Sequence, residues 1–312
     1  MIIDLHCDTI QRAKDEKLSL ANSKLAVNLK ETQENLPYIQ CMGTFINPKY
    51  NIKDGGFKRA NSIIDNFYEL YKKEQDKIYI IKNKNDLISK EFNNKTGVIL
   101  TIENGSAISS NLDNIKILYK KGIRMMGTVW NEDNELASGA NTKNDKGLTE
   151  LGKKYIQELE KNNIIIDVSH MSKKSFYDTL NNCNGPIIAS HSCTNAICQH
   201  YRNLDDEQIK QIAKRNGTIG VCFCNLFLTK EPKATVKDLV KHIDYIANLV
   251  GIDYISIGTD FDGVEKEHQL EDIKSVKDMY KLILELEKQG YIKNDIEKIT
   301  SKNFLRVANE IL

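Results

Sequence analysis

Several short apolar runs in this chain end in side chains that can bind a metal ion. The residues at these ends are His6, Asp8, Glu103, His170, His191 and Asp260. In a barrel of parallel strands, the carboxyl ends of all strands meet on one face, so residues far apart in the sequence can converge there. Three imidazoles and three carboxylates are enough ligands for two divalent ions. The pattern therefore predicts a two-metal site at the mouth of a barrel.

The first three of these residues differ in what they can offer an ion. His6 and Asp8 are two positions apart, and an extended backbone points both side chains to the same side. Glu103 follows an apolar run and precedes Asn104-Gly105, which is a turn signal. On its own, an acid in this position is more often a surface residue at the entry to a loop. As a ligand, its two oxygens could bridge two metal ions about 3.5–4 Å apart.

The other three residues end strands later in the chain. His170 and His191 follow consecutive apolar runs, and two imidazoles at matching positions are hard to explain by packing alone, whereas neutral imidazole suits zinc. Asp260 is in line with its strand, and nearby cations would keep it ionised as a base. For Asp262, two residues further on, we expect a structural role. We also expect no chemistry from the remaining histidines, which are His200, His242 and His268.

Length, charge and cysteine content narrow the class of protein. A chain of 312 residues suits a single barrel domain over residues 1–312. Lys and Arg total 44 against 43 Asp and Glu, so no broad basic field is present for nucleic acid or anionic lipid, and we expect a small-molecule partner. No apolar stretch approaches the roughly 18 residues that span a bilayer, and the start lacks a signal-peptide pattern. Seven irregularly spaced cysteines, with Cys222 and Cys224 in an apolar run, indicate buried reduced thiols of a cytoplasmic protein.

Alternating strand and helix patterns supply the frame for these residues. Eight short β-rich runs fall at 2–7, 39–46, 97–103, 123–129, 163–169, 186–191, 217–224 and 254–260. Helical periodicity appears at 57–74, 111–120, 149–161, 173–180, 205–214 and 236–250, and again at 272–289 and 294–312. Thr149 and Asp205 are suited to cap the helices that start beside them. Eight such units predict a closed (β/α)8 barrel of the TIM type, with the weakest pattern over 8–38.

Together, the motifs resemble those of the membrane dipeptidase family, also called renal dipeptidases, which are binuclear zinc hydrolases of the amidohydrolase superfamily. The resemblance covers nearly the whole chain and rests on six motifs in order: Asp4-Leu5-His6-Cys7-Asp8, Glu103-Asn104-Gly105, Asp167-Val168-Ser169-His170-Met171-Ser172, Ala189-Ser190-His191-Ser192, Arg202-Asn203-Leu204-Asp205-Asp206 and Gly258-Thr259-Asp260-Phe261-Asp262-Gly263. It implies two zinc ions, the first held by His6 and Asp8, the second by His170 and His191, with Glu103 bridging both.

The resemblance also implies roles for three further side chains. Asp260 corresponds to the acid/base residue beside the metals. Arg202 corresponds to the residue that grips the substrate's C-terminal carboxylate, a task suited to a planar guanidinium. Mammalian members carry a His, thought to stabilise the tetrahedral intermediate, where the best-aligned residue here is Trp130. An indole has one N–H donor and no proton to exchange at neutral pH, so Trp130 could donate toward the oxyanion or form a wall of the pocket.

These implications define the expected function and its alternatives. We expect a cytoplasmic, metal-dependent dipeptidase that hydrolyses dipeptides, including those with a C-terminal D-residue, without nucleic acid or membrane partners. One alternative is another amidohydrolase reaction, on a lactone, a phosphotriester or an N-acyl amino acid, or a deamination. Arg202 argues against it, because a carboxylate clamp serves an amino-acid-like substrate. A non-catalytic metal-binding relative is the other alternative, supported only by Trp130. The oligomeric state stays open, with a homodimer among the options.

Overall fold

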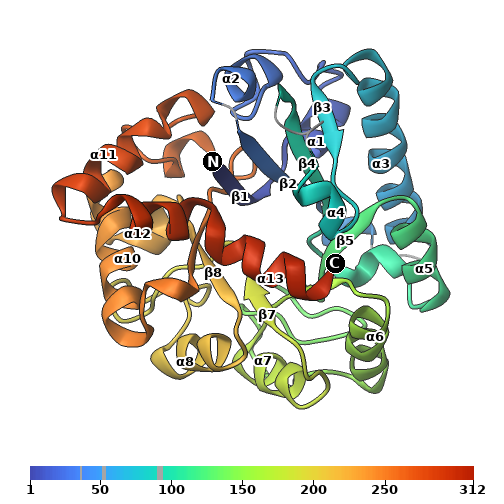
Figure 1. Cartoon of the computed structure of the whole chain (residues 1–312). Coiled ribbons are helices and arrows are strands. Elements are labelled where there is room, and N and C mark those ends of the chain that lie inside the picture. Colours follow the sequence, from blue (N-terminus) through green and yellow to red (C-terminus); the bar gives the residue numbers. More distant parts are fainter. Residues whose placement is uncertain (36, 51–53, 90–93) are drawn as a thin grey trace.

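The predicted strands form a closed barrel of parallel strands. In this computed structural model, which describes residues 1–35, 37–50, 54–89 and 94–312, all eight are present (Figure 1). They are β1 Ile2–Cys7, β2 Tyr38–Thr44, β4 Thr96–Ile102, β5 Ile123–Gly127, β6 Ile165–Asp167, β7 Ile187–Ala189, β8 Thr218–Cys222 and β9 Ile255–Gly258. Each pairs in parallel with its neighbours, and the pairing of β2 with β4, in which Ile39 lies opposite Gly97, closes the ring. The structure therefore confirms the predicted (β/α)8 fold.

A short strand that the sequence does not predict, β3 Ile78–Ile80, lies beside the start of β4. Its Ile78 is opposite Thr96, on the side of β4 where β5 pairs farther along. Three residues are too few to give an alternating pattern, so the strand leaves no clear signal in the sequence. It extends the sheet at the amino end of β4 and takes no part in closing the ring.

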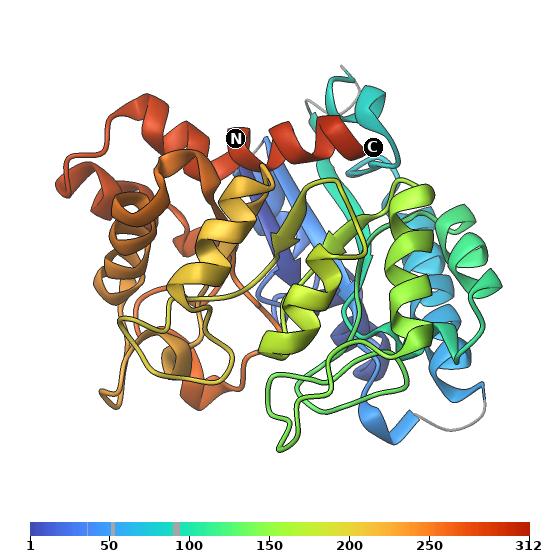
Figure 2. The same cartoon turned by 90° about the horizontal axis from the view of Figure 1, so that it is seen from below.

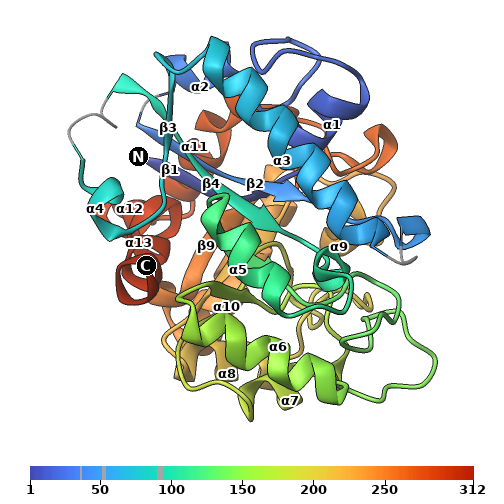
Figure 3. The same ribbon diagram turned by 90° about the vertical axis from the view of Figure 1, so that its right-hand side faces the viewer.

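Helices cover the outside of the barrel at the periodic segments, although the helix predicted to start at 272 begins only at Tyr280 (Figure 3). The longer ones are α3 Gly55–Lys73, α5 Asp113–Lys120, α6 Glu150–Lys161, α7 Lys173–Leu180, α8 Asp206–Lys214, α10 Val236–Val250 and α11 Tyr280–Lys288. Thr149 and Asp205 cap α6 and α8 as expected, since their side chains accept hydrogen bonds from the N–H groups of Gly152 and Gln208. Of the helices that the structure describes, none is long and apolar enough to cross a bilayer.

Several short helices escape prediction from the sequence. Within the described ranges they are α1 Thr9–Asp15, α2 Leu29–Glu34, α4 Lys84–Leu87 and α9 Asn225–Leu228. The longest of them has seven residues, which is about two turns, so no clear helical period can develop. α1 and α2 occupy the segment 8–38 where the pattern was weakest, and α1 begins directly after Asp8.

The last helices close the barrel at the amino ends of its strands. α12 Lys293–Glu297 leads through a π-helical turn, Lys298–Lys302, into α13 Asn303–Ile311. Phe304 of α13 is fully buried in a cluster with the barrel-lining residues Ile3 and Ile39. Figures 1 and 2 show α13 lying across one end of the barrel, opposite the long loop that follows β5. This apolar seal leaves the other end for the polar residues.

Two glycines make room for the chain that leaves β7. A Cβ atom added at Gly220 in β8 or at Gly258 in β9 would overlap the backbone carbonyl oxygen of Ser190. Ser190 directly precedes His191, so the missing side chains let this segment lie close against the neighbouring strands. The glycines therefore help to set the depth at which His191 sits in the barrel mouth.

Gly258→Ala should destabilise the protein by about 1–3 kcal/mol, because the added methyl group meets backbone atoms that cannot move independently. Gly185→Ala is the matched control. Its Cβ would meet Glu160 Oε1 at 3.5 Å, an ordinary contact, so its effect should stay within about 0.5 kcal/mol. Urea denaturation of both variants measures the difference. Equal stabilities would show that the close approach at Gly258 does not constrain the fold.

Candidate metal centre

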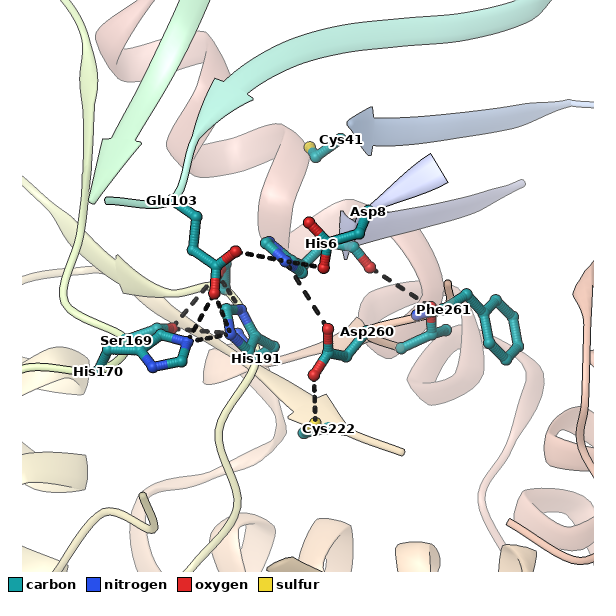
Figure 4. A network of polar contacts seen from close by, with 12 residues as sticks. His6, Asp8, Cys41, Glu103, Ser169, His170, His191, Cys222, Asp260 and Phe261 are labelled. Atoms are coloured by element: carbon teal, nitrogen blue, oxygen red, sulfur yellow. Dashed lines mark hydrogen bonds and ion pairs between the residues drawn. The ribbon is translucent and has the colours of Figure 1, made fainter. Parts of the chain in front are cut away.

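The residues at the strand ends converge on one buried cluster at the mouth of the barrel (Figure 4). The carboxylate of Glu103, just after β4, lies among three imidazoles. Its Oε2 is 3.7 Å from His6 Nε2, while its Oε1 is 3.0 Å from His170 Nε2 and 3.9 Å from His191 Nε2. The last two nitrogens are 2.8 Å apart. One carboxylate therefore faces ligand atoms that come from three other strands.

A second group of ligands surrounds His6. Its Nε2 is 3.6 Å from Asp8 Oδ2 and 3.8 Å from Asp260 Oδ1. Ligand atoms of His6, Glu103 and His191, and separately those of His6, Asp8 and Asp260, lie within 4.8 Å of one another. The structure thus brings together all the residues that the strand-end pattern singles out.

The cluster has the properties of a cation site. The side chains of His6 and Glu103 are only 2% and 6% exposed. His6 Nε2 and Asp8 Oδ1 are buried atoms that have no hydrogen-bond partner among the described residues. Leaving such atoms unpaired is costly, and a divalent cation would satisfy them. Imidazole nitrogens and carboxylate oxygens are also the donors that zinc binds, so the residues present fit this metal.

Burial shifts the protonation equilibria of these groups. It lowers the pKa of His170 and His191 well below the usual range, so both imidazoles are neutral and keep a lone pair for a metal ion. Burial also raises the pKa of Glu103 well above its usual range, and it raises the pKa of Asp260 to about 7 against the opposing influence of His6. Cations bound here would favour the ionised carboxylates and so oppose these upward shifts.

His170 and Asp260 turn sharply at the ends of their strands. Their φ angles are 68° and 61°, in the left-handed region that favours glycine. Figure 4 shows both side chains pointing into the cluster from these turns. A non-glycine residue held in this way costs of order 1–3 kcal/mol, and such residues gather at functional sites. The surrounding contacts must therefore hold both residues in place.

Polar residues to which the sequence assigns no role support the cluster. Asn131 Oδ1 lies 2.8 Å from His170 Nδ1, which leaves the Nε2 of this ring for the cluster. Asp4 is fully buried and accepts hydrogen bonds from Thr259 N at 2.8 Å and from Thr259 Oγ1 at 2.6 Å. This contact joins the strand of His6 to the loop that carries Asp260. Single polar residues of this kind have no distinctive spacing, so only the folded structure reveals them.

Two residues close to Asp260 have supporting positions. The fully buried side chain of Asp262 accepts hydrogen bonds from Thr9 Oγ1 at 2.6 Å and from Arg12 Nη1 at 2.9 Å. It holds α1 against the loop after β9, which confirms the expected structural role. The thiol of Cys222 is buried as expected, and its Sγ lies 4.0 Å from Asp260 Oδ2. Burial raises the pKa of Cys222 well above its usual range, so the thiol keeps its proton.

A cavity of about 640 Å³ opens over the cluster, and Trp130 and Arg202 stand in its wall. The Trp130 ring is 5.1 Å from that of Phe45 and 6.0 Å from that of His170. Arg202 is 3% exposed, and its Nη2 donates to the backbone oxygen of His191 at 3.0 Å. Its Nε is a buried atom that has no hydrogen-bond partner among the described residues. A buried guanidinium with an unused donor beside the cavity suits an anionic group of a ligand.

The remaining histidines differ in their surroundings. His242 is fully buried on α10, where its ring bonds the N–H of Thr194 at 3.1 Å and the carbonyl of Leu228 at 2.9 Å, in agreement with a structural role. His268 lies at the rim of the cavity. His200 lines the cavity wall, and its Nδ1 accepts a hydrogen bond from the backbone N–H of Arg202 at 3.2 Å. Its place beside Arg202 could not be read from its loop position in the sequence.

Comparison with known proteins agrees with this geometry. The chain matches the sequence profile of the membrane dipeptidase family (peptidase family M19) over residues 1–312. An uncharacterised Klebsiella pneumoniae protein from the pqqA 5′ region is 32% identical in an alignment of length 224 that covers 69% of this chain and 82% of that protein.

Solved structures with low sequence identity share the fold. A metallopeptidase from Rhodobacter sphaeroides, bound to a phosphinate mimic of the dipeptide L-Ala-D-Ala, superposes with a TM-score of 0.91 at 20% identity, covering 100% of this chain and 99% of that chain. The probable dipeptidase PvdM from Pseudomonas aeruginosa gives a TM-score of 0.91 at 21% identity, covering 100% of this chain and 95% of that chain.

Proposed function

Because the chain belongs to the membrane dipeptidase family and is therefore a metal-dependent dipeptidase, we propose that its barrel mouth holds two zinc ions. The observation that carries this proposal is the position of Glu103, whose two oxygens face His6 on one side and His170 and His191 on the other. In our assignment, His6 and Asp8 would hold one ion, His170 and His191 would hold the other, and Glu103 would serve both.

Asp260 serves as the acid/base residue of the reaction. Bound zinc ions would polarise the scissile carbonyl and lower the pKa of the attacking water. Asp260 takes the proton from this water and delivers it to the departing amine. Its position supports both steps, because Oδ1 lies 3.8 Å from His6 Nε2 while the side chain remains 18% exposed and lines the cavity.

Arg202 holds the C-terminal carboxylate of the substrate. Its guanidinium is buried, and its contact with the backbone of His191 places it next to the metal-binding cluster. A carboxylate bound there would leave the adjoining peptide bond near that cluster. This requirement favours a dipeptide over the lactone and phosphotriester substrates of other amidohydrolases, which have no free carboxylate. Trp130, packed between Phe45 and His170, forms part of the wall that encloses the substrate.

Dipeptides with a C-terminal D-residue are among the substrates that we infer. The Rhodobacter sphaeroides metallopeptidase, which has the same fold, is bound to a mimic of L-Ala-D-Ala. A cavity of about 640 Å³ is large compared with a dipeptide, so its size alone does not require one configuration at the C-terminal residue.

The cytoplasm is the location that we propose. All seven cysteines are free and buried, including Cys222 and Cys224 in the strand and loop near Asp260. Free thiols persist in a reducing compartment, whereas secreted proteins usually pair them.

Elemental analysis of the purified protein should find close to two equivalents of zinc per chain. His191→Ala and Glu103→Gln should each lower this ratio, because each removes a ligand. His242→Gln is a matched control that changes a buried, hydrogen-bonded imidazole outside the cluster. It should lower the unfolding temperature and leave the zinc content unchanged. Active protein with only stray metal would contradict the two-ion assignment.

Asp260→Asn should lower kcat by roughly 10²–10⁴, the range expected when a positioned acid/base group is lost. Its zinc content should stay close to that of the unmodified enzyme, since Asp260 is not one of the proposed ligands. Steady-state kinetics on one dipeptide, paired with elemental analysis of the same sample, separates the two effects. Turnover near that of the unmodified enzyme would remove Asp260 from the mechanism.

The proposed contact of Arg202 with the substrate carboxylate leads to a prediction about substrate class. The unmodified enzyme should cleave a free dipeptide much faster than its C-terminal amide, because a charge-assisted bond contributes about 1.5–3 kcal/mol. Arg202→Ala should remove most of this preference, whereas Arg202→Lys should keep part of it through its point charge. The ratio of kcat/KM for the two substrates is the measurement. Equal cleavage by the unmodified enzyme would favour the other amidohydrolase reactions.

A further inference from the structure

We propose that Ser190 and Asp167 are positioning residues that fix the orientation and the tautomer of His191. The inference rests on the proposed function, since it takes His191 to be a zinc ligand. Ser190 Oγ lies 2.7 Å from His191 Nδ1 and 2.5 Å from Asp167 Oδ2. The three side chains therefore form a chain of hydrogen bonds that ends at the ring nitrogen facing away from the cluster.

The direction of each hydrogen bond follows from which of its two atoms carries a proton. Asp167 Oδ1 accepts from the backbone N–H groups of Ser169 and Ser190, each at 2.9 Å. A carboxylate can only accept, so the single hydroxyl proton of Ser190 goes to Asp167 Oδ2. Ser190 Oγ must then accept from His191 Nδ1–H. With its proton on Nδ1, His191 presents the lone pair of Nε2 to the cluster, as a ligand must.

Burial makes this network hard to replace by water. Ser190 is fully buried, Asp167 is 4% exposed and His191 is 1% exposed. If Ser190 lost its hydroxyl, the Nδ1–H of His191 and an oxygen of Asp167 would both lose a partner that solvent cannot supply. Either the ring would turn or the other tautomer would become populated, and both changes weaken a metal ligand.

Asp167 also connects the two strand ends that carry histidines. It is the last residue of β6, and its Oδ1 holds the backbone N–H groups that directly precede His170 and His191. The ring of His170 has a different partner on its far side, since its Nδ1 lies 2.8 Å from the amide oxygen of Asn131. Asp167 therefore acts on both ligands through the backbone and on His191 through Ser190.

Ser190→Ala and Asp167→Asn should each raise the zinc dissociation constant by about 10- to 100-fold, the usual cost of losing a partner behind a metal ligand. Competition with a chelator, starting from metal-depleted protein, measures this constant. Ser190→Thr keeps the hydroxyl and should recover much of the affinity. Ser256→Ala is the matched control, because it removes a buried hydroxyl that pairs with Thr218 Oγ1 at 2.7 Å inside the barrel. It should lower stability without changing zinc affinity.

A second measurement needs no substitution. In the zinc-loaded protein labelled with ¹⁵N-histidine, NMR should detect a slowly exchanging proton on Nδ1 of His191 and metal bound at Nε2. The reverse assignment would overturn the proposal, as would zinc affinity in Ser190→Ala equal to that of Ser256→Ala. The variant His191→Ala separates the two possible failures. If it lowers zinc binding while Ser190→Ala does not, only this inference fails. If His191→Ala leaves zinc binding unchanged, the proposed metal site fails as well.

Discussion

The burial of several carboxylates beside three imidazoles is the interaction on which the rest of this structure depends. Removing ionised carboxylates from water is costly, and the upward pKa shifts of Glu103 and Asp260 express that cost. Cations bound among these groups would offset it, whereas without them the carboxylates would tend to hold protons. A site of this kind forms only where the fold holds the ligands together, because each ligand alone would be more stable in solvent.

The barrel holds these side chains together because its strand ends meet on one face and α13 closes the opposite end. Parallel strands deliver residues from β1, β4, β6, β7 and β9 to one face without long connections across the site. α13 closes the opposite end with Phe304, which packs in an apolar cluster with the barrel-lining residues Ile3 and Ile39. At the open end, Gly220 and Gly258 admit the backbone of Ser190, while Asp4 joins the strand of His6 to Thr259. Packing and hydrogen bonding thus help to fix the positions of these side chains.

The floor and the wall of the cavity have different tasks. The floor is built from strand ends and carries the groups to which we assign metal binding and proton transfer, which many hydrolytic reactions could use. The wall is built from loops, with Trp130 after β5 and Arg202 after β7. In the proposed role of Arg202, its buried guanidinium would select for a carboxylate and so narrow a general hydrolytic site to amino-acid-like substrates. Fold resemblance alone could not make that distinction, because related barrels support several chemistries.

The sequence by itself was sufficient to predict the barrel and the convergence of the strand-end side chains at its mouth. Runs of apolar residues mark fully buried parallel strands, and a side chain at the end of such a run has a defined place, so His6, Glu103 and His191 could be predicted to meet. Arg202 had no such signal within its loop and was found only through the family resemblance. The tertiary structure alone decided the contacts of Asn131, Ser190 and Asp167, the short strand β3 and the left-handed turns. These features depend on atoms that the fold brings together from distant segments. No local periodicity or residue spacing in the sequence indicates such contacts.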